Sequence, residues 1–226
     1  MLGGDPYFAN VVLLMQFDGD YTDKSLLAQA FTNTGTTLSA TGAKFGQSVS
    51  INGTSPGGGG ANRVQSNAAR SEYDLTSGDM TMEAWVRPNS TAANGAGARP
   101  IITLGGVAGS TISLYGDNNG TYFRYDFGGV FTLGSQSASV YLTNGIWYHV
   151  AATRQGNFTR LFVNGVMVVS STDGTVLSAS ARVAVIGNFN SSSQALDGAI
   201  DEARVTKGVA RYIANFTPPS APFKNS

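Results

Sequence analysis

Apolar residues in this chain occur in short runs, and several of these runs alternate with polar residues. The segments M-T-M-E-A-W-V-R (Met80–Arg87) and T-R-L-F-V (Thr159–Val163) are examples. Alternation with a period of two predicts strands that bury one face. Helical periodicity is nearly absent, and Gly, Ser, Thr and Asn fill the segments between the runs, as in chains with many turns. The pattern therefore predicts an all-β fold.

The predicted strands follow one another closely along the chain. The run Val11–Phe17 is apolar except for Gln16, which indicates a strand buried on both faces. Asn164-Gly165 is a strong hairpin signal, because both turn positions need a positive φ. So many strands with regularly spaced turns predict a two-sheet antiparallel sandwich of the jelly-roll type. The predicted strands are Val11–Phe17, Ser48–Ile51, Met80–Arg87, Ile101–Leu104, Thr111–Tyr115, Tyr122–Phe127, Trp147–Arg154, Thr159–Val163, Val166–Val169, Val183–Gly187 and Ala199–Thr206.

A strand pattern near the end of the chain is followed by a proline-rich segment. A turn at Lys207–Gly208 separates the two, and the prolines keep the segment out of a sheet interior. We therefore divide the chain into an N-terminal arm (1–10), a sandwich (11–206) and a C-terminal tail packed on the sandwich (207–226). Simple alternation in the last strand places Ile200, Glu202, Arg204 and Thr206 on one face, and Asp201, Ala203 and Val205 on the other.

The composition narrows the classes of partner. The 226 residues suit one all-β domain, and with 12% charged residues and a net charge of zero there is no basic excess to attract nucleic acid or an anionic membrane. The absence of cysteine removes disulfides, thiolate metal sites and a cysteine nucleophile. The longest apolar run near the start, Val11–Met15, is too short for a signal peptide or a membrane span.

Five blocks of sequence follow one another along the chain: Asp5–Gly19, Lys44–Gly53, Gly78–Pro88, Trp147–Arg154 with Arg160–Gly165, and Ala199–Phe223. The third block reads T-x-E-x-W-V-x-P, and the fourth reads W-x-H-V-A followed by L-x-V-N-G. In this order the blocks resemble the concanavalin A-like (laminin G-like jelly-roll) domains of bacteriophage tail, fibre and other virion proteins. The two end blocks carry the resemblance to phage proteins.

The resemblance implies a virion protein made in the host cytoplasm without a signal peptide and acting by binding. Its partners would be other virion proteins and a glycan on the host surface, without membrane insertion. The alternative is a purely structural protein that decorates a capsid or tail. A weaker alternative is a glycan-cleaving enzyme.

Catalytic residues are hard to find in the sequence. Glu83 shares a strand face with Thr81 and Arg87, so the strand offers no second carboxylate for glycoside hydrolysis. Glu83 is therefore interpreted as a polar anchor for an arginine or for the backbone. His149 is the single histidine, and the G-T-S-P-G string (Gly53–Gly57) has no helix after it to form a nucleophile elbow. We expect no enzyme activity.

Carboxylates near the first and last strands suggest a cation. Asp18, Asp20 and Asp23 follow the first strand, and Asp201 and Glu202 lie in the last. Calcium takes carboxylate and carbonyl oxygens together. The resemblance implies a structural calcium held by Asp18 and Asp201 with backbone carbonyls. The alternative is that these carboxylates cap turns and strand ends.

Loop residues offer candidates for glycan binding, since sugars bind amides, carboxylates and aromatic rings. The best cluster is the D-N-N-G turn with its flanking tyrosines, and the G-N-F-N-S segment (Gly187–Ser191) is second. The alternative for each is an ordinary β-turn. The candidates are Tyr115, Asp117, Asn118, Asn119, Tyr122, Asn188 and Asn190.

The arm contains an aromatic pair, Tyr7 and Phe8, after Gly3, Gly4 and Pro6. Aromatic side chains supply much of the binding energy at protein interfaces, so the pair is a candidate for docking to the virion. The alternative is that the two rings cover the edge of the domain's own core.

Overall fold

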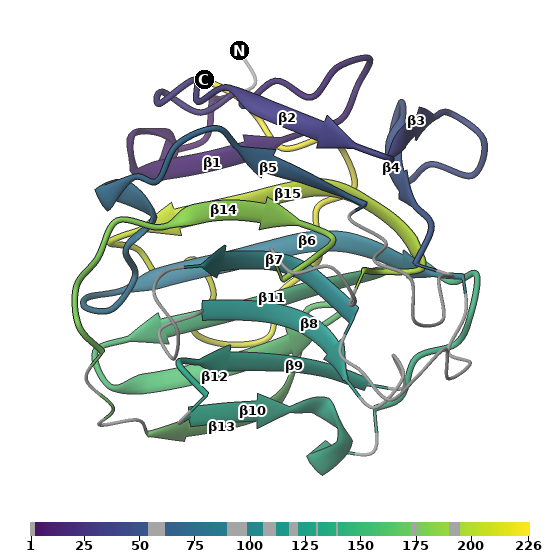
Figure 1. Ribbon diagram of the computed structural model, residues 1–226. Coiled ribbons are helices and arrows are strands. Elements are labelled where there is room, and N and C mark those ends of the chain that lie inside the picture. Colours follow the sequence, from purple (N-terminus) through teal and green to yellow (C-terminus); the bar gives the residue numbers. More distant parts are fainter. Residues whose placement is uncertain are drawn as a thin grey trace.

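Two stacked antiparallel sheets form the protein in the computed structural model (Figure 1). The all-β prediction and the sandwich prediction are confirmed. The structure describes residues 3–53, 62–89, 99–105, 112–117, 122–129, 131–138, 140–172, 175, 177–189 and 195–226.

Sheet A has eight strands, which run in the order β13-β12-β11-β6-β15-β4-β3. The strand β1 lies off this path and pairs with the second half of β15, whose first half pairs with β4. The strands of sheet A are β1 (Val11–Met15), β3 (Thr37–Ser39), β4 (Ser48–Ile51), β6 (Met80–Pro88), β11 (Tyr148–Gln155), β12 (Phe158–Val163), β13 (Val166–Thr172) and β15 (Gly198–Lys207).

Sheet B has seven strands in the order β10-β9-β8-β7-β14-β5-β2, and it forms the near layer in Figure 1. Among the described residues the helices are short 3₁₀ turns: η1 (Phe8–Asn10), η2 (Ser71–Tyr73) and η3 (Ser135–Ala138). The strands of sheet B are β2 (Phe31–Thr34), β5 (Arg63–Ser66), β7 (Arg99–Gly105), β8 (Ile112–Asp117), β9 (Tyr122–Phe127), β10 (Phe131–Gly134) and β14 (Val183–Ile186).

The core lies between the sheets and is built from alternate residues of the strands. This is the packing that the period of two predicts, because successive side chains point to opposite faces. In β6 and β9, for example, the core residues are Met80, Met82, Ala84, Val86, Phe123, Tyr125 and Phe127.

The last strand departs from the predicted alternation. Ile200 lies in the core together with Ala203 and Val205, whereas the sequence placed Ile200 on the opposite face from them. The cause is a β-bulge: Glu202 has a φ of 53°, and the register with β6 shifts between Asp201 and Arg204. The extra residue reverses the alternation for the rest of the strand.

Strand β1 is buried on both faces, as predicted. Leu13 and Met15 belong to the core between the sheets. Val11 and Leu14 face the other way and pack with Phe223 of the C-terminal tail. The tail therefore provides the second cover that an entirely apolar strand needs.

The tail crosses the outer face of sheet A, on the side away from sheet B (Figure 1). Thr81 of β6 donates its hydroxyl to the carbonyl of Val209 at 2.9 Å. Thr153 of β11 does the same to the carbonyl of Tyr212 at 2.8 Å. The ring of Tyr212 stacks on Phe216, with 3.6 Å between centroids. The chain's own residues thus occupy much of this face.

Candidate functional site

A polar groove lies on the outer face of sheet B, at the edge formed by β2 and β5. Val64 of β5 points into the core, so its neighbours Arg63 and Gln65 point outward. The antiparallel register sets Thr32 of β2 opposite Gln65 and Thr34 opposite Arg63. The groove encloses about 220 Å³ and is lined by Thr32, Thr34, Arg63, Gln65, Ser66 and Asn67.

Hydrogen bonds hold the side chains of this groove in place. Thr32 Oγ1 donates to Asn67 Oδ1 at 2.7 Å, and Arg63 Nε donates to Gln65 Oε1 at 2.7 Å. Ser66 Oγ donates to the carbonyl of Ala68 at 3.0 Å. Each amide oxygen accepts one of these bonds and keeps a second lone pair, and Thr32, having donated its proton, keeps acceptor capacity. The groove thus presents both donors and acceptors in fixed positions.

Sequence reasoning missed this groove because it missed both strands that form it. F-T-N-T and R-V-Q-S contain one apolar residue each, which is too little for a hydrophobic pattern. The signal that was present is the alternation of Thr32 and Thr34 and of Arg63 and Gln65. That alternation becomes informative only after the two strands are paired.

The predicted glycan loops lie in part beyond the described residues. Asn118, Asn119 and Asn190 fall outside them, and so do the side chains of Asp117 and Tyr122. The backbones of Asp117 and Tyr122 pair with each other at the end of the β8–β9 hairpin. The D-N-N-G segment therefore connects these two strands, as the sequence suggested.

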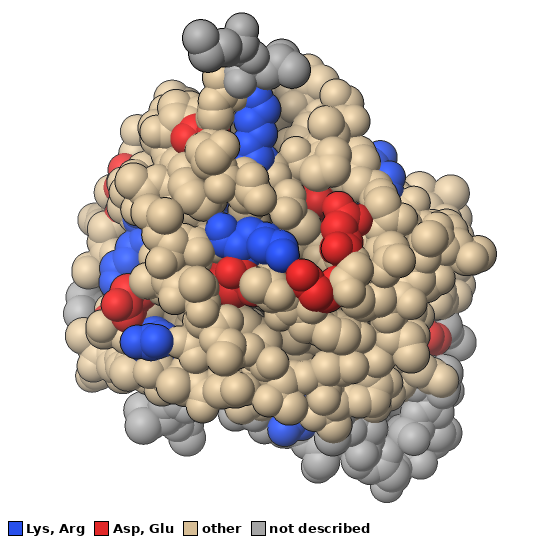
Figure 2. All heavy atoms as spheres, turned by 90° about the horizontal axis from the view of Figure 1, so that it is seen from above, with Lys and Arg blue, Asp and Glu red and all other residues tan. Residues whose placement is uncertain are grey.

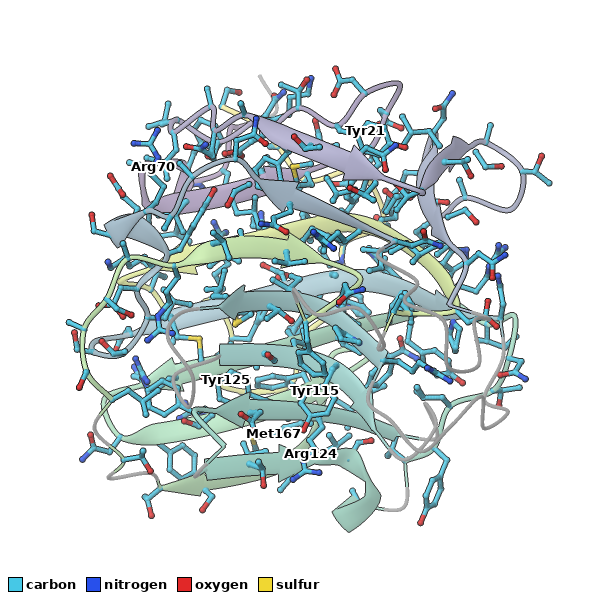
Figure 3. The ribbon with its side chains drawn as sticks, viewed as in Figure 1. Tyr21, Arg70, Tyr115, Arg124, Tyr125 and Met167 are labelled. Carbon is cyan, nitrogen blue, oxygen red and sulfur yellow. The ribbon has the colours of Figure 1, made fainter. Side chains whose placement is uncertain are left out.

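Tyr115 and Asn188, the other predicted glycan residues, are buried. Tyr115 is 6% exposed, and its ring packs edge to face on Phe189 with 5.4 Å between centroids. The guanidinium of Arg124 lies 5.9 Å from the same ring, on the neighbouring strand (Figure 3). Asn188 is 0% exposed and its backbone pairs with Ala195. Both side chains support the structure around the loops and present little surface to a ligand.

Asp18, Asp201 and Glu202 come together where β15 bulges. Asp18 Oδ1 accepts from the amide of Gln47 at 2.7 Å, and Asp201 Oδ2 accepts from the amide of Phe45 at 3.0 Å. Glu202 Oε2 accepts from the amide of Phe223 at 2.8 Å, which ties the tail to the bulge. The other oxygens, Asp201 Oδ1 and Glu202 Oε1, are buried and have no hydrogen-bond partner.

Burial and repulsion between neighbouring carboxylates raise the pKa values of Asp201 and Glu202. Burial raises the pKa of Asp201 to about 7, and the nearby Asp18 carboxylate adds to the effect. Burial likewise raises the pKa of Glu202 to about 8, with Asp201 and Asp18 contributing repulsion. Asp201 Oδ1 and Glu202 Oε1, the two oxygens without a hydrogen-bond partner, could contribute two ligands to a cation. However, the described residues contain no group of three or more His, Cys, Asp or Glu side chains that could hold a metal ion. A calcium ion here would therefore depend on backbone carbonyls, as the resemblance implied, and the calcium site stays a prediction.

Glu83 lies at the centre of a buried polar cluster beneath the tail. Its Oε1 is 2.7 Å from a guanidinium nitrogen of Arg204, so Arg204 is the arginine partner that the sequence suggested. Its Oε2 accepts from the hydroxyl of Tyr212 at 2.8 Å and lies 3.2 Å from Nε2 of His149. Burial alone would raise the pKa of Glu83, but Arg204 and His149 outweigh it and hold the value at about 2. Glu83 is thus a fixed anion.

The geometry of this cluster is that of a structural anchor. A glycosidase needs two carboxylates that both reach the sugar, one of them able to carry a proton. Glu83 is 0% exposed, its oxygens are occupied, and Tyr212 and Phe216 of the tail cover His149. A substrate could reach Glu83 only after the tail had moved away.

The arm is held against the body of the domain. Asp5 lies 2.7 Å from Arg211 and 3.1 Å from Arg204, and its amide donates to the carbonyl of Ser226. Phe8 packs against the cluster around Phe223. Tyr7 remains 43% exposed, with the Arg211 guanidinium 5.3 Å from its ring. The structure therefore places Phe8 over the domain's own core edge and leaves Tyr7 at the surface.

Charges are mixed over the surface that is visible from above. Figure 2 shows Lys and Arg side chains close to Asp and Glu side chains, with uncharged surface around them. Lys24 and Asp20 form an ion pair, with 3.0 Å between Nζ and Oδ2. This face lacks the basic stripe that nucleic acid would require. Within the described residues, no helix has the length and apolar character to cross a membrane.

Solved structures of low sequence identity share the fold. The binding domain of Paraclostridial Mosquitocidal Protein 1 matches with a TM-score of 0.66 at 12% identity, over 89% of this chain and 49% of that chain. Domain 4 of AbnA, a GH43 extracellular arabinanase from Geobacillus stearothermophilus, was solved with arabinotriose. It matches with a TM-score of 0.63 at 17% identity, over 89% of this chain and 94% of that chain. The ligand-binding domain of botulinum neurotoxin serotype D was solved with N-acetylneuraminic acid. It matches with a TM-score of 0.62 at 13% identity, over 90% of this chain and 49% of that chain. The chain thus spans about half the length of the two toxin domains. At these identities the likeness shows the fold alone.

The sequence itself matches a family profile but no curated protein. The profile is that of the concanavalin A-like lectin/glucanases superfamily, and it matches residues 57–210, more than half of the chain. Together with the two-sheet antiparallel sandwich, this match shows that the chain belongs to the concanavalin A-like lectin/glucanases superfamily.

Proposed function

We propose that the chain is a non-catalytic module that binds glycans through the outer face of sheet B. The observation that carries the proposal is the polar groove at the β2–β5 edge, whose hydroxyl and amide groups are held in place by hydrogen bonds. Such groups recognise sugar hydroxyls. Sheet A is a poorer candidate, because the tail lies across its outer face.

The structural neighbours support this proposal. One was solved with arabinotriose and another with N-acetylneuraminic acid, so domains of this shape hold sugars in other proteins. The buried, tail-covered position of Glu83 supports a binding role over hydrolysis.

We further propose that the module belongs to a bacteriophage particle and attaches it to a glycan on the host surface. The support is the resemblance of the first block (Asp5–Gly19) and the last block (Ala199–Phe223) to phage virion domains. Immunogold labelling of purified particles tests the location. Absence of the chain from the particles would remove the virion role and leave the glycan-binding proposal in place.

Glycan binding is tested by applying the full chain to an array of neutral and acidic glycans. Replacing Thr34 with Val removes one groove hydroxyl at nearly constant volume, and we expect about tenfold weaker binding for the loss of one good hydrogen bond. Thr172→Val, at an exposed position at the end of β13, is the matched control and should bind as the unmodified chain does. A chain that labels particles but binds no glycan would instead be a structural decoration protein.

A further inference from the structure

Strand β13 forms an open edge of sheet A. It stands at one end of the strand order, and among the described residues β12 is the one strand that pairs with it. Successive residues of an antiparallel strand direct their peptide groups to opposite sides, so about half of those in β13 point away from β12. The N–H of Met167 donates to Asn215 Oδ1 of the tail at 2.9 Å, which covers the start of the edge. The segment Val168–Thr172 is left open to a further strand.

The sequence of β13 lacks the residues that usually protect such an edge. Natural edge strands are short, covered, or carry lysine or proline, which prevent pairing with another chain. β13 has seven residues, V-M-V-V-S-S-T, and none of them is charged or a proline. A bulge interrupts its pairing with β12 beside Val168, but the pairing is regular from Val169 to Thr172. The other described edges are shorter or buried: β3 has three residues, β2 and β10 have four each, and β1 is buried throughout.

Exposed apolar side chains adjoin this edge. Val166 and Met167 are 54% and 38% exposed, and Ile213 of the tail is 55% exposed. Ile213 lies two residues before Asn215, the tail residue that contacts Met167. Exposed apolar surface that includes methionine is typical of protein–protein interfaces. The open peptide groups and the apolar side chains thus mark the same margin of the molecule.

We propose that β13 pairs antiparallel with β13 of a second copy of this chain, about a two-fold axis, so that two copies share one continuous sheet. An antiparallel edge is complementary to itself under a two-fold rotation, because the N–H groups of each copy then face carbonyls of the other. The strand has no charge and the chain has no net charge, so two copies meet without repulsion. Because Asn215 covers the start of the edge, the axis passes close to Ser170.

A dimer formed through β13 leaves the polar groove of each copy free. Figure 1 shows β13 and β10 along the lower margin of the sandwich and β2 along the upper margin. The two β2–β5 grooves would therefore lie at the ends remote from the shared edge. The pairing does not depend on glycan binding, but it would make a glycan-binding module bivalent and raise its avidity for a surface that repeats the same sugar.

Analytical ultracentrifugation of the full chain tests the pairing. Backbone hydrogen bonds and a small apolar patch predict a Kd on the order of 10 μM. Ser170→Lys and Ser170→Glu, at an exposed position, should each weaken the dimer by about tenfold or more, because like charges across paired strands destabilise the pair. An equimolar mixture of the two variants should dimerise as the wild-type chain does, since Lys then faces Glu. Melting curves verify that both variants are folded.

Thr37→Lys is the matched control, because it adds a lysine at an exposed position on β3, at the opposite end of the strand order of sheet A. It should dimerise as the wild-type chain does. A wild-type chain that stays monomeric at about 100 μM, or a Ser170→Lys variant that dimerises fully, would overturn the proposal. A mixture that associates no better than either Ser170 variant alone would place the contact on another surface. Loss of association in Thr37→Lys would indicate head-to-tail pairing of β13 with β3 and would also overturn the two-fold dimer.

Discussion

The buried carboxylate pair on β15 makes stability depend on pH in an unusual direction. Burial raises the pKa of Glu202 from 4.5 to about 8, so the native state holds this proton more tightly than the unfolded chain does. The resulting stabilisation is complete below the unfolded pKa and is lost as the pH rises toward the folded value. Between about pH 5 and about pH 8.5 the free energy of unfolding should therefore fall.

The structure sets the size of this effect. A pKa difference of one unit corresponds to about 1.4 kcal/mol, so the change from 4.5 to about 8 sets an upper limit of about 5 kcal/mol for Glu202. Asp201 is the adjacent residue and titrates with Glu202 as a coupled pair, and relaxation with water entry reduces the cost of ionisation. We expect a net loss of about 2 kcal/mol, which lowers the melting temperature by about 4–8 °C for a chain of this size.

Urea denaturation followed by tryptophan fluorescence measures this effect, in the presence of EDTA so that no divalent cation neutralises the pair. Glu202→Gln can still accept from the amide of Phe223 but has no proton to lose, so its stability should vary much less with pH. Glu72→Gln removes a partly exposed carboxylate whose pKa is lowered by a hydrogen bond from its own backbone, so Glu72 stays ionised over this pH range and the substitution should leave the profile unchanged. A wild-type chain that is as stable at about pH 8.5 as at about pH 5, or a Glu202→Gln profile of the same slope, would refute the reasoning.

Other predictions test the neighbouring features. Calcium should raise the melting temperature of the wild-type chain but not that of Asp201→Asn, because a ligand bound only by the native state stabilises the native state. An unchanged melting temperature of the wild-type chain, with no ion found by native mass spectrometry, would refute the calcium site. Tyr212→Phe removes a donor to the buried Glu83 carboxylate and should cost about 1.5–3 kcal/mol in urea denaturation, whereas a negligible cost would argue against this anchoring of the tail. The chain should release no reducing ends from host polysaccharide, and release that disappears in Glu83→Gln would show catalysis. If the D-N-N-G loop binds the glycan, as the sequence suggested, in place of the β2–β5 groove, then alanine at both Asn118 and Asn119 should weaken host adsorption and leave incorporation into particles unchanged; normal adsorption would exclude this loop from the glycan site.

Strands with strong patterns were predicted well from the sequence. β4 and β9 have the predicted bounds, and β6 extends one residue beyond its prediction, to Pro88. Each of these three has alternating or wholly apolar residues that a period-two pattern detects. The bulge at Glu202 could not be predicted in this way, because a positive φ in a glutamate depends on tertiary contacts such as its bond to Phe223.

The candidate site was less accessible to sequence reasoning. A D-N-N-G turn is visible in the sequence because its residue types are distinctive, and it attracted the glycan prediction for that reason. The β2–β5 groove is built from common residues, such as Thr32 and Gln65, that become a site only when two weak strands pair. The burial of Tyr115 depends on its packing against Phe189, a contact that local pattern does not reveal.

The position of β15 has a consequence for biosynthesis. This strand lies in the interior of sheet A, between β6 on one side and β4 and β1 on the other, yet it is the last of the described strands to be synthesised. At typical synthesis rates of about 5–20 residues per second, β1 waits roughly ten to forty seconds for its partner. Throughout that interval the apolar segment Val11–Met15 has neither a pairing strand nor the cover of Phe223. Folding of sheet A therefore waits until β15 has been synthesised, and a nascent chain that stalls before residue 198 exposes an unpaired apolar strand to chaperones, proteases and other copies of itself.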